Sequence, residues 1–204
     1  MEEQQKKRSY FVPVLLLLLV VSFTGNILLV SKRVSDDQED RVQRGLAIIA
    51  DGKQAKLHID AVLTNVDAML GSGSDISRRL AAKGALGAAF KQADEVIRFM
   101  GEAQKISGKS FPSTKRDAAS FFGEAERSML QLGNHDGPLT APEQAYLQMM
   151  KQVYEQLKTD LAPFEYKTVS RDIGLTVQTG GAWVDMASRM QEAINAPDNV
   201  VFKP

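Results

Sequence analysis

The chain has 204 residues, which is enough for one ordinary domain or for a small domain with an appended segment. Lys plus Arg and Asp plus Glu number 25 each, so the formal net charge is zero and no basic excess is present to neutralise nucleic-acid phosphates. The sequence contains no cysteine, which excludes disulfides, thiol nucleophiles and cysteine-ligated metals, and it contains only two histidines. We therefore expect neither nucleic-acid binding nor a bound cofactor.

Residues 11–30 form the most apolar stretch and carry no formally charged side chain. A run of consecutive leucines, Leu15 to Leu19, lies at the centre of this stretch. A helix rises about 1.5 Å per residue, so twenty residues reach across the roughly 30 Å hydrocarbon core of a bilayer. No polar face interrupts the run, as it would in a core helix of a soluble protein. The sequence predicts a transmembrane helix over 11–30, preceded by a short basic tail, residues 1–10.

The orientation of this helix is not settled by the positive-inside rule alone, because basic residues lie on both sides. Lys6–Arg8 precede the segment and Lys32–Arg33 follow it directly. A short basic tail, an apolar run and one long domain are the layout of a signal or signal anchor. Because the apolar run continues to Val30, past its small polar residues, we expect a retained signal anchor in the cell membrane. The tail is then cytoplasmic, and residues 31–204 form an extracytoplasmic domain.

Apolar residues recur at helical spacing through most of residues 31–204. The spacing predicts helices over about 35–70, 76–107, 118–132, 141–161 and 182–194. Residues 163–180 either extend a kinked helix or are interrupted by their glycines. No strand-like alternation is long enough to found a sheet. The expected fold class is all-α, with the transmembrane helix followed by an antiparallel bundle of four or five helices.

Small and charged residues in the first predicted helix bear on its packing. Gly45 and Gly52 stand where larger side chains would be expected, and they allow a neighbouring segment to approach closely. The charged block 35–44 either continues rigidly from the membrane helix or acts as a hinge.

Two expectations concern the helix predicted over 76–107. Its apolar spacing places Ile76 and Leu80 on the buried face, together with Leu86. Asp94 and Arg98 are spaced for an i,i+4 ion pair on the solvent-facing side.

Start signals are clear at several helices. Thr140–Glu143 form a T-x-x-E capping box with Pro142 in the first turn. Ser74 or Asp75 is the expected N-cap of the second helix, and Thr114–Asp117 resembles a capping pattern for the third.

One stretch, Ala103–Ser110, fits a relaxed phosphate-loop pattern. Such a loop needs a strand before it and a helix after it, so that backbone N–H groups converge on phosphate. Here a helix is predicted before the motif, and Pro112 prevents immediate helix growth after it. We interpret the stretch as an ordinary helix end at Gly108.

Neither histidine belongs to a recognisable catalytic or metal-ligating motif. His58 lies in the middle of a predicted helix without a second ligand four residues away, so we expect it to be solvated or at an interface. His135 lies in a turn rich in Asn, Asp and Gly. Without a G-x-S-x-G or S-x-x-K motif, the sequence favours a protein that is not an enzyme.

Trp183, Phe121 and Met186 are the candidate interaction residues, although most methionines are expected to fill the core. Trp183 is either a packed core anchor or an exposed interaction hot spot. The leading hypothesis is a single-pass, membrane-anchored, non-enzymatic protein whose bundle binds a protein partner or associates with itself. The alternative is a sensing bundle with a small-molecule site between helices, near Trp183 or the glycine-rich turns.

Overall fold

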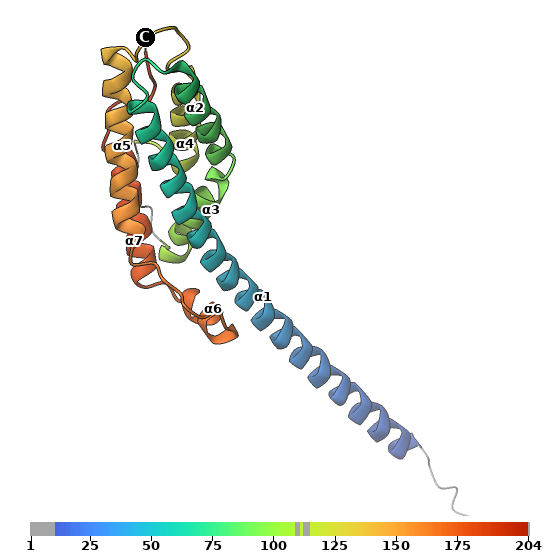
Figure 1. Ribbon diagram of the computed structural model, residues 1–204. Coiled ribbons are helices and arrows are strands. Elements are labelled where there is room, and N and C mark those ends of the chain that lie inside the picture. The colour runs from blue at the N-terminus through green and yellow to red at the C-terminus, as the bar shows by residue number, and fades with distance from the viewer. Residues whose placement is uncertain (1–10, 109–110, 112–114, 204) are drawn as a thin grey trace, which may run out of the picture.

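The computed structural model describes residues 11–108, 111 and 115–203, and all regular structure in these ranges is helical. Seven helices follow one another in this part of the chain: α1 (Phe11–Leu70), α2 (Ile76–Phe90), α3 (Ala93–Ser107), α4 (Ala118–Gln131), α5 (Ala141–Leu161), α6 (Arg171–Val177) and α7 (Ala182–Asn195) (Figure 1). The prediction of an all-α chain is confirmed. The predicted number of four or five bundle helices is not confirmed, and the predicted basic tail lies outside the described residues.

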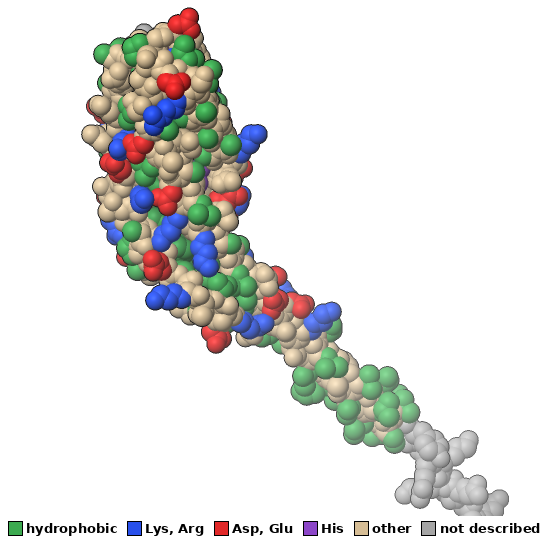
Figure 2. Space-filling model, viewed as in Figure 1, with side chains coloured by type: hydrophobic (Ala, Val, Ile, Leu, Met, Phe, Trp, Pro, Cys, Tyr) green, Lys and Arg blue, Asp and Glu red, His purple; other side chains and the backbone are tan. Residues whose placement is uncertain are grey.

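Helix α1 is unbroken over 60 residues and joins the apolar segment, residues 11–30, to the remainder of the molecule (Figure 1). Among the described residues it is the one helix long and apolar enough to cross a bilayer, and its apolar window has no buried residue. Figure 2 shows this segment as a rod covered by hydrophobic side chains, with charged side chains beginning only beyond it. The charged block 35–44 remains helical, so of the two alternatives the structure contains the rigid connection.

From Val42 onward α1 buries one face, and we call residues 42–203 the head. Seven-residue spacing of Val42, Ile49, Leu63 and Leu70, with Ile59 and Val66 between them, predicts an apolar seam on α1. All of these residues are buried except Leu70, which is half-buried. Burial of apolar area at about 25 cal/mol per Å² makes this face a major source of the stability of the head.

The other helices are arranged around α1. Helices α2, α3, α5 and α6 contact α1 directly, α7 lies against α3 and α5, and α4 lies against α2 and α3. We call the end of the head where α1 stops the distal end, because it is farthest from the apolar segment (Figure 1). The α1–α2 turn and the α4–α5 loop both lie at this distal end, whereas α6 lies at the opposite end beside α1.

Several helices begin with a side-chain N-cap at a position that the sequence predicts. The carboxylate of Asp75 accepts the backbone N–H of Arg78, and that of Asp117 accepts the backbone N–H of Ser120. Thr114, the first residue of the predicted capping pattern, lies outside the described residues. The capping box of Thr140 is present in both directions at the start of α5. Each such cap satisfies an N–H that the helix itself leaves without a partner.

The helix predicted over 76–107 is divided into α2 and α3 at Lys91–Gln92. Its predicted buried face is also wrong at the start, since Ile76 is 36% exposed and Leu80 is 53% exposed. The helix buries Arg79 and Ala82 instead, because Arg79 binds backbone carbonyls of the α4–α5 loop. The hydrogen bonds of Arg79 therefore determine which face of α2 is buried, and this face differs from the one that hydrophobicity alone predicts.

The predicted Asp94–Arg98 pair is replaced by a different arrangement. Arg98 Nη2 lies 2.9 Å from Asp51 Oδ1 on α1 and 3.1 Å from Glu95 Oε1 on its own helix. The pair with Asp51 joins α3 to α1, which an interaction within one helix could not do.

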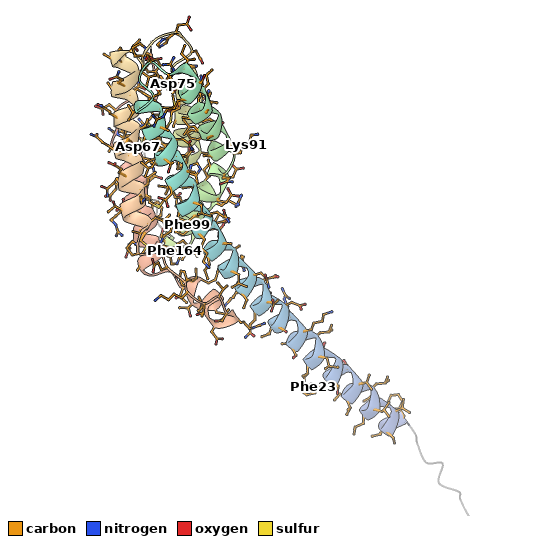
Figure 3. All side chains as sticks on the ribbon, viewed as in Figure 1. Phe23, Asp67, Asp75, Lys91, Phe99 and Phe164 are labelled. Atoms are coloured by element: carbon orange, nitrogen blue, oxygen red, sulfur yellow. The ribbon has the colours of Figure 1, made fainter. Side chains whose placement is uncertain are left out.

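The glycines of α1 do permit close approach, as predicted. A Cβ added at Gly45 would lie 1.9 Å from the carbonyl oxygen of Gly174 in α6, and one added at Gly52 would lie 2.2 Å from the ring of Phe164. Phe164 lies beside Phe99 near the end of the head that faces the apolar segment (Figure 3). Backbone contact at Gly45 thus holds α6 directly against α1.

Replacement of Gly45 by alanine is expected to displace α6 and to lower the free energy of unfolding by about 2 kcal/mol, because the new methyl group meets backbone rather than a flexible side chain. Denaturant unfolding measures the loss. The single tryptophan should report displacement of α6 through its fluorescence, because Trp183 Nε1 donates to the carbonyl of Val177 at the end of α6.

The matched control is Gly84→Ala on α2, where an added Cβ meets nothing within 4 Å. That change should raise stability by about 0.5–1 kcal/mol through helix propensity. Equal effects of the two substitutions would contradict the close α1–α6 contact.

Candidate interaction surfaces

The three candidate interaction residues all lie in the core of the head. Phe121 is fully buried, Trp183 is 3% exposed and Met186 is 8% exposed. None of these side chains is therefore available to a partner at the surface of the head in this conformation.

Of the two alternatives for Trp183, the structure shows the packed core anchor. Its indole Nε1 donates to the carbonyl of Val177 at 3.0 Å, and its ring lies 5.4 Å from that of Phe99. Phe99 in turn meets Phe164 edge to face at 5.0 Å. These contacts join α3, α6 and α7, and they leave Trp183 a structural role at the end of the head nearest the apolar segment.

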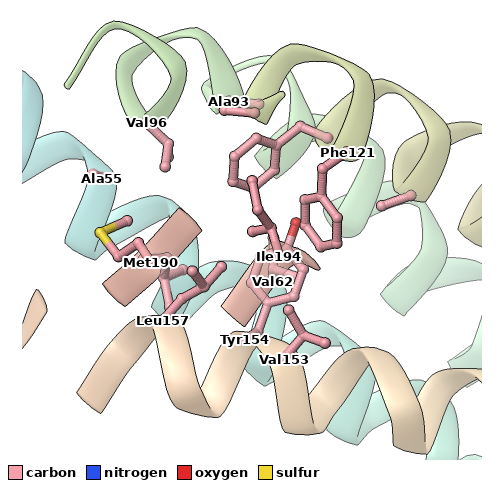
Figure 4. Packing of buried hydrophobic residues seen from close by; sticks show 14 of the residues in the cluster. Ala55, Val62, Ala93, Val96, Phe121, Val153, Tyr154, Leu157, Met190 and Ile194 are labelled. Atoms are coloured by element: carbon pink, nitrogen blue, oxygen red, sulfur yellow. The ribbon is translucent and has the colours of Figure 1, made fainter. Parts of the chain in front are cut away.

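Phe121 belongs to a second aromatic group, in the middle of the head. Its ring lies 5.1 Å from that of Phe122 and 6.4 Å from that of Tyr154 on α5 (Figure 4). The neighbouring methionines fill the core, as predicted, with Met129, Met150 and Met190 fully buried.

His58 is fully buried between helices, so of the two expected positions the solvated one is wrong. Its Nδ1 donates to the carbonyl of Ala89 at 2.9 Å, whereas its Nε2 has no hydrogen-bond partner among the described residues. Burial lowers the pKa of His58, and the Ala89 carbonyl opposes this effect. The signal was present in the sequence, because position 58 falls between Ala55 and Val62 on the buried face of α1.

The densest polar cluster of the head lies at its distal end. Glu143 accepts hydrogen bonds from the backbone N–H of Gly133 at 2.7 Å, from that of Thr140 at 2.8 Å and from His135 Nε2 at 2.8 Å. Burial of Glu143 by itself would raise its pKa, but these hydrogen bonds outweigh burial and lower the pKa to about 2.

His135 is tied to this cluster through both ring nitrogens. Nδ1 faces the backbone oxygen of Asp136 at 2.9 Å, and Nε2 faces Glu143. Only the protonated ring can donate to both oxygens. The backbone oxygen of Asp136, followed by Glu143, raises the pKa of His135 above its ordinary value.

Buried Arg79 fixes the loop that follows α4, residues 132–139, which we call the distal loop. Its guanidinium is fully buried and donates to the carbonyls of His135 and Gly137, both at 2.6 Å. Lys83 on the same helix donates to the carbonyl of Leu132 and to the side chain of Asn134. Burying a charge is costly unless it is paired with acceptors, so the bonds of Nη1 and Nη2 hold the distal loop in one shape, while Arg79 Nε has no partner among the described residues.

The sequence reasoning missed this cluster, because the fold rather than the apolar spacing determines the buried face of α2. Arg79 lies three residues before Ala82 and seven before Leu86, on the buried face that α2 adopts. A charged residue at such a position requires a polar partner inside the fold. Only the fold shows that the partner is the distal loop.

A second surface feature lies on α1 between its neighbouring helices. Seven positions at alternating three- and four-residue spacing carry no charge and are exposed or half-buried: Ala47, Ala50, Gln54, Leu57, Ala61, Thr64 and Ala68. We call this strip the uncharged α1 face. The pair Asp51–Arg98 borders it toward α3, and the pair Asp60–Lys158 borders it toward α5. Leu57 is 58% exposed at the middle of the strip.

The head also has a shallow hollow of ≈ 660 Å³ between α3, the start of α4 and α7. Its lining includes Met100, Gln104, Arg116 and Gln191, but not Trp183. Within the described residues no group of three or more His, Asp or Glu side chains could hold a metal ion.

The phosphate-loop pattern at 103–110 lacks the required geometry in its described part. Helix α3 precedes it, and Gly108 ends that helix in the left-handed conformation, with φ of 63°. Residues 109 and 110 lie outside the described residues, so the interpretation as a helix end rests on the part up to Gly108.

Comparisons with protein-family models, with curated proteins and with solved structures found no match to this chain.

The Glu143→Gln substitution is expected to lower the free energy of unfolding at neutral pH by about 2 kcal/mol, because charge-assisted hydrogen bonds are lost at a buried site. The lowered pKa of Glu143 stabilises the native state above the ordinary value of 4.5, and this contribution is lost as the pH falls toward about 2. The variant should therefore lose less stability than the wild type over that range, as measured by denaturant unfolding at several pH values.

Glu102→Gln provides the control, since Glu102 forms an exposed ion pair with Lys105 at 2.6 Å. Such a pair contributes less than about 1 kcal/mol to the free energy of unfolding. If both substitutions cost equally little, the distal loop does not depend on Glu143.

Proposed function

We propose that this chain is a single-pass, membrane-anchored, non-enzymatic protein whose extracytoplasmic helical bundle mediates protein–protein interaction or assembly. The anchor is supported by the apolar, unburied window of α1 near the N-terminus. The bundle is supported by the packing of α2, α3, α5 and α6 around the distal half of α1. In this arrangement the basic tail is cytoplasmic, residues 11–30 are a retained signal anchor, and the head is outside.

The fixed distal loop is the observation that carries the proposal. Between Val30 and Leu70 α1 advances about 60 Å at 1.5 Å per residue, so the distal loop stands well beyond the lipid headgroups. Asn134, His135 and Asp136 are exposed on a loop whose carbonyls are held by buried Arg79. A loop fixed before binding loses little conformational entropy when a partner docks, which favours recognition of a protein surface.

Assembly has a separate surface, the uncharged α1 face. Its three- and four-residue spacing is that of the a and d positions of a coiled coil. Anchored copies share one orientation relative to the bilayer, so two such faces would meet in parallel with Leu57 opposite Leu57. Exposed Leu57 is the apolar contact that such a pairing would bury.

The alternative function is a sensing bundle that binds a small molecule. The hollow between α3, α4 and α7 has a volume within the range of ligand sites, about 300–1,000 Å³. Gln104, Arg116 and Gln191 would supply its polar contacts. A ligand there would stabilise the head by mass action, so screening metabolites for a rise in melting temperature tests this alternative.

The chain without cysteine allows single cysteines to report on both topology and partners. An Asp136→Cys variant is expected to react with a membrane-impermeant maleimide in intact cells. It is also expected to crosslink a second protein when it carries a photoactivatable reagent, because the distal loop faces outward. Labelling only after cell lysis would contradict the extracytoplasmic head.

Glu165→Cys near the opposite end of the head is the positional control, since Glu165 is also exposed. It should label like Asp136→Cys but fail to crosslink the same partner. A crosslink of equal yield from both positions would contradict recognition through the distal loop.

Self-association is tested by Leu57→Cys in native membranes. Parallel pairing through the uncharged α1 face predicts a disulfide-linked dimer on mild oxidation, because the two introduced thiols face one another. Leu80→Cys on α2, where the native side chain is 53% exposed, is the matched control and should remain monomeric. Monomer from both variants would exclude this mode of assembly.

A further inference from the structure

His58 lies where four helices of the head meet. It belongs to α1, its Nδ1 binds the carbonyl of Ala89 on α2, and its ring is surrounded by an aromatic cage. The cage consists of Phe90 on α2 at 6.0 Å, Phe122 on α4 at 5.7 Å and Tyr154 on α5 at 6.1 Å, measured between ring centroids. The ring is fully buried, so each of these helices keeps water from it.

The neutral ring suits this position and the protonated ring does not. Nδ1–H is already used by the Ala89 carbonyl, so a second proton would have to bind Nε2. Nε2 has no hydrogen-bond partner among the described residues, and neither does the hydroxyl of Tyr154. A cation placed there would be desolvated without a paired acceptor, which is among the costliest arrangements in a protein interior.

The groups that face His58 come from α2, α3, α4 and α5. From α3, the carboxylate of Glu95 attracts a protonated His58; its Oε1 accepts Arg98 at 3.1 Å, and its Oε2 is buried without a hydrogen-bond partner among the described residues. From α5 the facing titratable group is Tyr154, whose own pKa burial raises well above its ordinary value. From α2 and α4 the facing side chains are Phe90 and Phe122. Burial outweighs the effect of Glu95 and lowers the pKa of His58.

We propose that His58 is an acid-responsive switch, whose protonation opens the head where α1, α2, α4 and α5 meet. Opening separates the aromatic cage and exposes the ring of Phe121, which packs against Phe122 and Tyr154. A side chain buried in the closed head then becomes available to a partner. The switch does not depend on the anchor or on the distal loop.

The sign of the effect follows from the pKa of His58. The native state holds this pKa below the ordinary value of 6.5. The unfolded state therefore binds more protons than the native state when the pH falls below 6.5, and stability decreases toward the lower native pKa. His135, the other histidine, has the opposite sign, because its raised pKa stabilises the native state below 6.5 and this contribution is lost at higher pH.

The test compares the full-length wild type with His58→Gln in a nonionic detergent, using denaturant unfolding between pH 7 and pH 5. Glutamine still offers an N–H to the Ala89 carbonyl but does not titrate. If His58 remains neutral in the native state throughout, the unfolding constant of the wild type should rise by up to about 25-fold more than that of the variant. Hydrogen exchange in α4 and α5 should accelerate over the same pH range in the wild type alone.

His135→Gln is the matched control, and it should leave the acid destabilisation in place. The two histidine resonances of the wild type provide a second measurement if His58→Gln does not fold. They should show His135 titrating above 6.5, and His58 taking up its proton only as the head opens. A His58 ring that titrates at or above 6.5 in a closed head would overturn the proposal, as would equal pH dependence of the wild type and a folded His58→Gln variant.

Discussion

The continuity of α1 is the constraint on which the rest of the structure depends. One helix supplies both the apolar segment and the central face against which α2, α3, α5 and α6 pack. Because its hydrogen-bonded backbone continues through the charged block 35–44, the head is joined to the apolar segment by a stiff rod. Gly45 extends this role, since its missing side chain lets α6 rest on the backbone of α1. The other helices of the head are therefore positioned relative to the axis of α1.

Buried polar groups have different effects at the distal end of the head and in its middle. At the distal end, Arg79 Nη1 and Nη2 and the carboxylate of Glu143 bind backbone groups of one loop and fix its shape, although Arg79 Nε has no partner among the described residues. In the middle of the head, His58 is buried with one nitrogen left without a partner among the described residues. The first arrangement favours rigidity, and the second leaves a place where a proton changes the balance between closed and open states.

Hydrophobic spacing and start signals predicted the helical class, the seam of α1 and the capping box at Thr140. The same reasoning failed at Ile76 and Leu80, because hydrophobic spacing cannot anticipate that Arg79 must face inward to reach the distal loop. The positions of Phe121 and Trp183 in the core also depended on contacts between distant helices. Spacing within one helix identifies a buried face, but partners far apart in sequence decide which polar residues that face can accept.

In the proposed anchored arrangement, the unbroken α1 would transmit any tilt of its membrane-spanning part to the head. Transmembrane helices tilt by about 20° on average, and the tilt follows the local thickness of the hydrocarbon core. Over the roughly 60 Å from Val30 to Leu70, a 20° tilt displaces the far end sideways by about 20 Å. Because α1 has no break between Phe11 and Leu70, the lipid composition around the proposed anchor would then determine how far from the membrane normal Asp136 lies.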